Sequence, residues 1–173
     1  MTRSYSAALP VAHVVLRILV VLNWLLAAAI LVLLVAIPHE SWIMKELKLT
    51  PSPEATQIVW GLRSVAVLGL VAAPLNHVVL SRLLAMVGSV RVGDPFIRAN
   101  AHRLRAIAWS LLGLQLIGLV IAAIGRVLAN AGHKIDFDAG FSINGWLAVL
   151  IAFILAHVFA EGALMREDLE ATI

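Results

Sequence analysis

Five ionisable side chains fall inside long apolar stretches of this sequence, and their types could support chemistry within a membrane. They are Arg17, His77, Arg82, His157 and Glu161. Burying such groups in hydrocarbon is costly unless they are paired or hydrated, so each is a functional candidate. His157 and Glu161 are four residues apart and share a helix face. We expect Arg17 or Arg82 to pair with Glu161, either to fix helix order or as part of a site that binds a small anion or relays protons.

The two histidines in the spans are candidate haem ligands. His77 and His157 lie eight or nine residues before the ends of two helices that run in the same direction, which predicts a similar depth. In a simple bundle these helices are diagonal, so the two imidazoles could face each other and ligate a b-type haem. The alternative, which we favour, is two separately hydrogen-bonded histidines and no cofactor.

Catalytic motifs are absent from the sequence. There is no H-E-x-x-H, no G-x-S-x-G and no glycine-rich phosphate loop. The chain also has no cysteine, which excludes disulfides, thiolate metal sites and a thiol nucleophile. We therefore expect neither an enzyme nor a metal site.

The composition indicates that lipid is the solvent of this chain. Of 173 residues, 62% are hydrophobic and only 13% are charged, whereas soluble domains are nearer 45 to 50% apolar and about 25% charged. We predict one all-α membrane domain over residues 1–173, a bundle of four transmembrane helices running up-down-up-down. The expected spans are residues 14–37, 60–86, 104–129 and 145–165. The run Ile18–Ile37 has 20 residues without a charge, about 30 Å of helix and enough to cross a bilayer core. A signal peptide, the alternative for this segment, would have a shorter apolar region.

The basic residues predict the orientation. Eight of the 13 flank one side of the membrane: Arg3, Arg17, Arg82, Arg91, Arg98, Arg103, Arg105 and Arg166. The other five are Lys45, Lys48, Arg63, Arg126 and Lys134. Because positive residues favour the cytoplasmic face, we expect a multi-pass protein of a bacterial inner membrane with both termini in the cytoplasm. Basic residues scattered in this way do not predict nucleic-acid binding, although the net charge is +3.

The connections between spans carry local signals. Asp94 followed by Pro95 predicts a helix that starts there and continues to Ala129. On its first turns Arg98, His102 and Arg105 form a stripe, either for anionic lipid or for an acidic partner. Residues 38–57 favour a short interfacial helix, and residues 133–144 favour either a small hairpin or an irregular turn.

Two stretches on the predicted cytoplasmic side resemble those of a known family. Gly93, Phe96, Asn100, Arg103, Leu104 and Ile107 fit the spacing G-x-x-F-x-x-x-N-x-x-R-L-x-x-I, with Asp94 inside it. The tail Glu161–Ile173 is similar to the same family's ending, except that Glu170 and Ala171 interrupt its D-L-T run. The resemblance is to the DUF2975 family of small bacterial four-helix membrane proteins, whose activity is not established. Its members are often encoded beside a small helix-turn-helix regulator, which implies a membrane protein that senses a signal or holds such a regulator.

These observations favour a non-enzymatic signalling or regulator-tethering module. Its contact surface would comprise Phe96, Asn100, Arg103 and the tail, facing a helix-turn-helix partner in the cytoplasm. The alternative is a small transporter or proton-linked module that uses His77, His157 and Glu161. Four helices are few for a transporter, so that alternative requires a homo-oligomer.

Overall fold

The structure is a computed structural model, and it describes residues 5–36, 52–91, 95–130 and 142–170. Its four helices are α1 (Tyr5–Ala36), α3 (Pro53–Arg91), α4 (Arg98–Asn130) and α5 (Ile143–Glu170). At about 1.5 Å per residue they are roughly 40 to 60 Å long. Each is long and apolar enough to cross a membrane. The predicted all-α fold with four spans is confirmed.

Local sequence signals explain where two of the helices begin. The hydroxyl of Ser52 accepts a hydrogen bond from the backbone N–H of Ala55 at 3.1 Å, and Pro53 follows as the first helical residue of α3. At α5 the hydroxyl of Ser142 accepts from the backbone N–H of Gly145 at 3.1 Å. In both cases a serine side chain satisfies a donor that the first turn leaves without an intrahelical partner.

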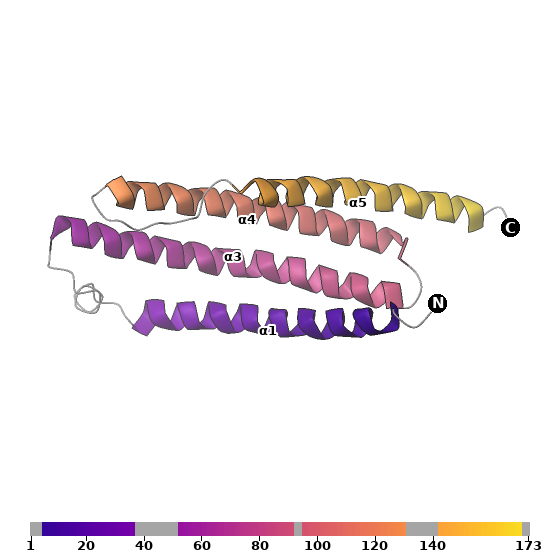
Figure 1. Cartoon of the computed structure of the whole chain (residues 1–173), viewed down its shortest axis with the longest axis horizontal. Helices are drawn as coiled ribbons and strands as arrows, with labels where there is room; N and C mark the ends of the chain where they lie inside the picture. The colour runs from indigo at the N-terminus through magenta and orange to yellow at the C-terminus, as the bar shows by residue number, and fades with distance from the viewer. Residues whose placement is uncertain (1–4, 37–51, 92–94, 131–141, 171–173) are drawn as a thin grey trace.

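Consecutive helices run in opposite directions and lie side by side (Figure 1). The start of α1, the end of α3, the start of α4 and the end of α5 therefore lie at one end of the molecule. We call it the arginine-rich end. It is defined by Arg17, Arg82, Arg91, Arg98, Arg103, Arg105 and Arg166.

The helices form an open row. Within the described part, α1 packs against α3, α3 against α4 and α4 against α5, and no other pair of helices is in contact. The two outer helices, α1 and α5, therefore do not meet. This arrangement separates side chains that a closed four-helix bundle would bring together.

Small residues allow the neighbouring helices to approach closely. Ala73, Ala108, Ala152 and Ala163 are all buried. A Cβ added to Gly113 would lie 3.0 Å from Cδ1 of Leu75 on α3. Short side chains are common where membrane helices associate. In lipid the hydrophobic effect does not drive helices together, so they depend on close van der Waals contact between their backbones.

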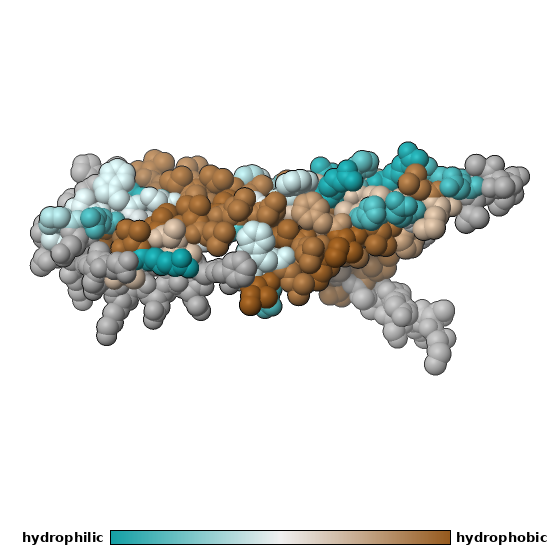
Figure 2. Space-filling model, turned by 90° about the horizontal axis from the view of Figure 1, so that it is seen from above, coloured by the Kyte–Doolittle hydropathy of each residue, from teal (hydrophilic) through white to brown (hydrophobic). Residues whose placement is uncertain are grey.

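The outer surface is largely apolar over the middle of the helices. Leu26 and Val35 on α1 and Leu150 and Ile154 on α5 are each more than half exposed. Figure 2 shows the resulting broad hydrophobic band, with hydrophilic residues gathered toward the arginine-rich end. Such a band is unfavourable in water and matches the hydrocarbon of a bilayer.

The start of α4 differs from the sequence prediction. The helix begins at Arg98 rather than at Pro95. The carbonyl of Pro95 accepts a hydrogen bond from the side chain of Asn100 at 2.7 Å, whereas a helix starting there would offer that carbonyl to a backbone N–H. A side-chain bond therefore replaces the first backbone bond of the predicted helix, and the prediction was wrong by three residues.

Several expectations concern residues outside the described part. These are the roles of Gly93 and Asp94, the part of the interfacial helix within residues 38–51 and the part of the hairpin or turn within residues 133–141. The remaining residues of those two segments are described, and of these residues 53–57 belong to α3 and residues 143–144 to α5.

Candidate functional site

Asn100 is the centre of a buried polar network at the arginine-rich end. Its side chain is 0% exposed. Its Nδ2 donates to Oγ of Ser89 on α3 at 2.8 Å and to the carbonyl of Pro95 at 2.7 Å. Its Oδ1 accepts from Nη1 of Arg103 at 2.8 Å. One amide thus connects the end of α3, the turn after it and the first turn of α4.

Arg103 extends the same network to the backbone of α3. Its Nη1 also donates to the carbonyl of Ala85 at 3.3 Å. Both acceptors of Arg103 are neutral oxygens, so these bonds hold the guanidinium in place without balancing its charge. Ser89 completes the network by donating its hydroxyl to the carbonyl of Met86 at 2.8 Å.

Phe96 joins this turn to α5. Its ring lies 5.2 Å from that of Phe159, centroid to centroid, at an interplanar angle of 31°. A Cβ at Gly162 would lie 3.1 Å from Cδ1 of Phe96. Even a methyl group at this position would require the ring to move by a few tenths of an ångström, which gives Gly162 a packing role.

Leu104 and Ile107 pack between three helices. Together with Ala156 of α5 they form a buried apolar cluster. Val79, Leu83 and Met86 of α3 pack against this cluster. The described residues of the family motif therefore hold α3, α4 and α5 together at one end.

This packing corrects the contact surface predicted from the sequence. Asn100 is fully buried and Arg103 is half-buried, so the amide of Asn100 cannot touch a partner. Phe96 is 45% exposed and also packs on α5. The motif builds and stiffens the surface at this end, and the exposed residues around it form that surface.

The polar residues within the spans do not converge on one site. Arg17 lies exposed on α1, Arg82 lies exposed on α3, and His157 and Glu161 lie exposed on α5. Glu161 forms no ion pair with Arg17 or Arg82, and α5 packs directly against neither α1 nor α3.

His77 likewise has its partner on another helix. Its Nδ1 accepts a hydrogen bond from Nε1 of Trp24 on α1 at 3.1 Å, and the two rings lie 5.4 Å apart. His77 therefore turns toward α1, whereas His157 belongs to α5, which packs against α4. Within one chain the two imidazoles therefore do not take up the facing arrangement that was the alternative considered for a haem. In the described part of the chain, no group of three or more His, Asp or Glu residues could hold a metal ion.

Two hollows at the arginine-rich end are lined by basic side chains. The first lies between α4 and α5, has a volume of about 190 Å³ and is lined by Arg98, Ala101, His102, Arg105, Ala160 and Leu164. The second lies between α3 and α4, has a volume of about 380 Å³ and is lined by Arg82, Ala99, His102, Arg103 and Ala106. His102, which is exposed, borders both. In the first hollow the basic side chains all come from α4, whereas the second combines Arg82 of α3 with His102 and Arg103 of α4, an arrangement suited to an anion.

Glu167 of α5 pairs with Arg98, the first residue of the basic stripe on α4. Its Oε2 accepts a hydrogen bond from Nη2 of Arg98, and the two side chains are 48% and 63% exposed, respectively. An exposed pair of this kind is worth about 0 to 1 kcal/mol. It links the first turn of α4 to the last turns of α5.

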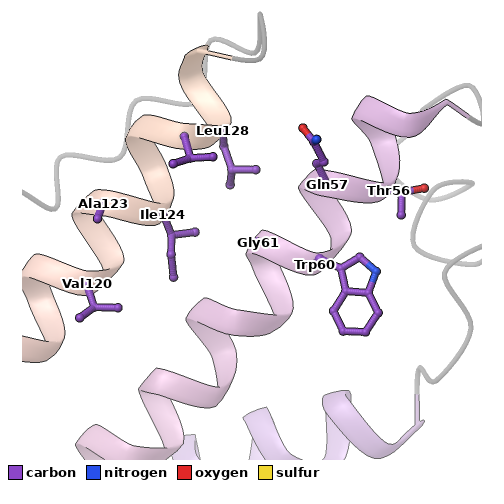
Figure 3. A pocket seen from close by; sticks show the side chains of 9 residues that line it. Thr56, Gln57, Trp60, Gly61, Val120, Ala123, Ile124 and Leu128 are labelled. Carbon is purple, nitrogen blue, oxygen red and sulfur yellow. The ribbon is translucent and has the colours of Figure 1, made fainter.

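A third hollow lies near the opposite end and has a different character. Its volume is about 500 Å³, and it lies between the first turns of α3 and the last turns of α4 (Figure 3). Val120, Ile124 and Leu128 line one side and Trp60 the other, with Thr56 and Gln57 as the polar groups. Its apolar lining suits a hydrocarbon chain better than a polar substrate.

Sequence reasoning missed the partners of the motif. Asn100 and Arg103 are three residues apart in the sequence, a spacing that brings side chains together on a helix. By contrast, Ser89, Phe159 and Gly162 lie on other helices, and no local pattern connects them to the motif. Trp24 was likewise missed as the partner of His77.

Comparison with known proteins gives a family match for most of the chain. A family model described as "Protein of unknown function (DUF2975)" matches residues 42–173. No curated protein and no solved structure matches the chain.

Proposed function

Because the chain belongs to the DUF2975 family, whose description assigns no activity, we propose a function from the geometry of its arginine-rich end. It is a non-enzymatic module that needs no cofactor and holds an acidic soluble regulator at the membrane surface. The proposal includes a bacterial inner membrane and an arginine-rich end that faces the cytoplasm, in keeping with the excess of basic residues there.

The depth of the membrane can be traced across the row from contacts between helices. Arg17 ends the charge-free run of α1, which is about 30 Å long and matches a bilayer core. Trp24, seven residues further along α1, contacts His77 of α3. Since the two helices are antiparallel, Arg17 is level with residue 84 of α3. Ser89 of α3 contacts Asn100 of α4, so the same depth on α4 falls at residues 104–105. Trp109 of α4 contacts Phe153 of α5, so on α5 this depth falls at about residue 158.

The last turns of α5 extend beyond that level. Leu164 and Met165 lie six and seven residues past it, about 10 Å of helix. A lipid headgroup layer is roughly 5 to 8 Å thick, so these side chains reach the aqueous edge. They are 45% and 62% exposed, respectively. The observation that carries the proposal is that these two apolar side chains are exposed; by the depth estimate above they lie at the outer edge of the headgroup layer, where hydrocarbon does not cover them.

The neighbouring charges favour an acidic partner. Leu164 lines the same hollow as Arg98, His102 and Arg105 of α4. The carboxylates of Glu161, Glu167 and Asp168 are also exposed on this part of α5, so the cationic side of the surface is the one that α4 provides. An apolar centre with charged residues around it is a common composition for a protein interface, in which charge steers association and apolar contact stabilises it. The partner we propose is a soluble helix-turn-helix regulator, in line with what the family resemblance implies.

The test is photocrosslinking in native membranes. A photoreactive amino acid in place of Met165 should attach one soluble acidic protein reproducibly, and the purified protein should rebind to the membrane protein. The substitution Arg105→Glu should reduce the attachment several-fold, because it reverses a charge beside the contact surface. A photoreactive residue at Val127, which is 68% exposed near the other end of α4, is the control. Equal attachment from both positions, or attachment unaffected by Arg105→Glu, would contradict the proposal.

A further inference from the structure

The hollow between α3 and α4 at the arginine-rich end is lined by basic side chains and is not filled by side-chain packing. Arg82 of α3 faces it from one helix, and His102 and Arg103 face it from the other. Ala99 and Ala106 complete the lining, one turn before and one turn after Arg103. Because these two neighbours are alanines, no long side chain of α4 fills the space on either side of the guanidinium. The remaining volume is about 380 Å³.

The cationic groups of this hollow have no acidic partner among the described residues. The two acceptors of Arg103 are the amide oxygen of Asn100 and the carbonyl of Ala85, both uncharged. The ion pair at this end that involves α4 joins Arg98 to Glu167, outside this hollow. Two arginines and a histidine thus share a concave site without a carboxylate, which leaves an uncompensated positive charge.

One of these groups is held in place before any ligand binds. Arg103 is half-buried and fixed by the network of Asn100, whose side chain is completely buried. A guanidinium that is already ordered loses less conformational entropy when it binds an anion. This distinguishes the hollow from a set of flexible arginines that extend independently toward the membrane surface.

The hollow also lies at the depth of lipid phosphates. Arg82 is two residues, about 3 Å, from the level of Arg17 on the neighbouring helix. Arg103 reaches the carbonyl of Ala85 and so lies at the same depth. That level is the boundary at which the charge-free run of α1 ends, where a bilayer places its headgroups.

We propose that this hollow binds the phosphodiester group of an anionic membrane phospholipid. The guanidinium groups of Arg82 and Arg103 donate hydrogen bonds to the phosphate oxygens, and an N–H of the His102 ring donates a further one. The apolar surfaces of α3 and α4 below the hollow receive the acyl chains. Free inorganic phosphate could make the same hydrogen bonds. We favour the lipid because the hollow lies at the depth of the headgroups, and a soluble phosphate ion would not require a site at that depth.

The experiment uses the full chain, purified in nanodiscs with equal parts of phosphatidylglycerol and phosphatidylcholine. Native mass spectrometry counts the lipids that stay bound after the nanodisc is removed. We expect a preference for phosphatidylglycerol that Arg82→Gln lowers by about fivefold, the effect of one basic residue at an anionic surface. Arg82 makes none of the network's bonds, so this variant should fold. Arg126→Gln removes the same charge from the exposed surface at the opposite end of α4 and should leave the preference unchanged.

Three results would overturn the proposal. The first is an unchanged preference in Arg82→Gln, verified as folded by circular dichroism. The second is an equal decrease in Arg82→Gln and Arg126→Gln, which would indicate a general effect of net charge. The third is displacement of the lipid by millimolar inorganic phosphate with no preference among lipids, which would assign the site to free phosphate. The measurement contains no soluble partner, so its outcome is independent of the tethering function.

Discussion

Removing the side chain of Asn100 should destabilise the junction of α3 and α4 more than any other single deletion of a polar group at this end. The substitution Asn100→Ala abolishes three hydrogen bonds, two donated by Nδ2 and one accepted by Oδ1. Arg103 keeps its bond to the carbonyl of Ala85, and Ser89 keeps its bond to the carbonyl of Met86. The carbonyl of Pro95 loses the hydrogen bond that it accepts from Nδ2 of Asn100.

The magnitude follows from these separate losses. A hydrogen bond to a charged group contributes about 1.5 to 3 kcal/mol, and a buried acceptor left without a donor costs about 1 to 3 kcal/mol. Because Pro95 is only half-buried, the lower part of the second range applies. We expect the free energy of unfolding to fall by about 3 kcal/mol.

The assay is unfolding of the purified protein in mixed micelles with increasing dodecyl sulfate, followed by tryptophan fluorescence. Amide hydrogen exchange provides a local measurement and should become faster over residues 97–101 while α5 near Phe153 keeps its protection. Asn76→Ala, an exposed asparagine of α3, is the matched control and should change stability by less than about 0.5 kcal/mol. A loss in Asn100→Ala as small as in this control, with unchanged exchange, would refute the assigned role of the network.

Three further predictions concern two other contacts and the membrane orientation. Gly162→Leu should displace the ring of Phe96 and lower stability by about 1 to 3 kcal/mol, whereas Gly118→Leu, where a Cβ meets no atom within 4 Å, should change the same unfolding curve little. The substitutions Trp24→Phe and His77→Ala should be non-additive by about 1 kcal/mol in a double-mutant cycle, because each removes the same hydrogen bond; additive effects would show that the bond contributes nothing. In the orientation proposed here, Arg91→Cys should resist an impermeant maleimide added outside intact cells, and since the chain has no cysteine of its own, any labelling would reverse that orientation.

The arginine-rich end shows how far local patterns reach. The spacing of Phe96, Asn100, Arg103 and Leu104 identified a family motif and indicated that this end matters. The spacing did not reveal that Asn100 is buried, since its partner Ser89 lies eleven residues earlier on another helix. The same limit applies to Gly162, whose lack of a side chain acquires a reason only from the ring of Phe96 on the turn before α4.

The amino-acid sequence by itself determined the four spans, their alternating direction and the gathering of arginines at one end. These follow from hydropathy, helix length and charge, which are properties of each segment alone. The tertiary structure decided which side chains meet. Because the helices pack as an open row, Glu161 on α5 is separated from Arg17 and Arg82, and His77 bonds to Trp24 rather than facing His157. Contacts between helices depend on which faces pack together, and the composition of a single segment does not specify that choice.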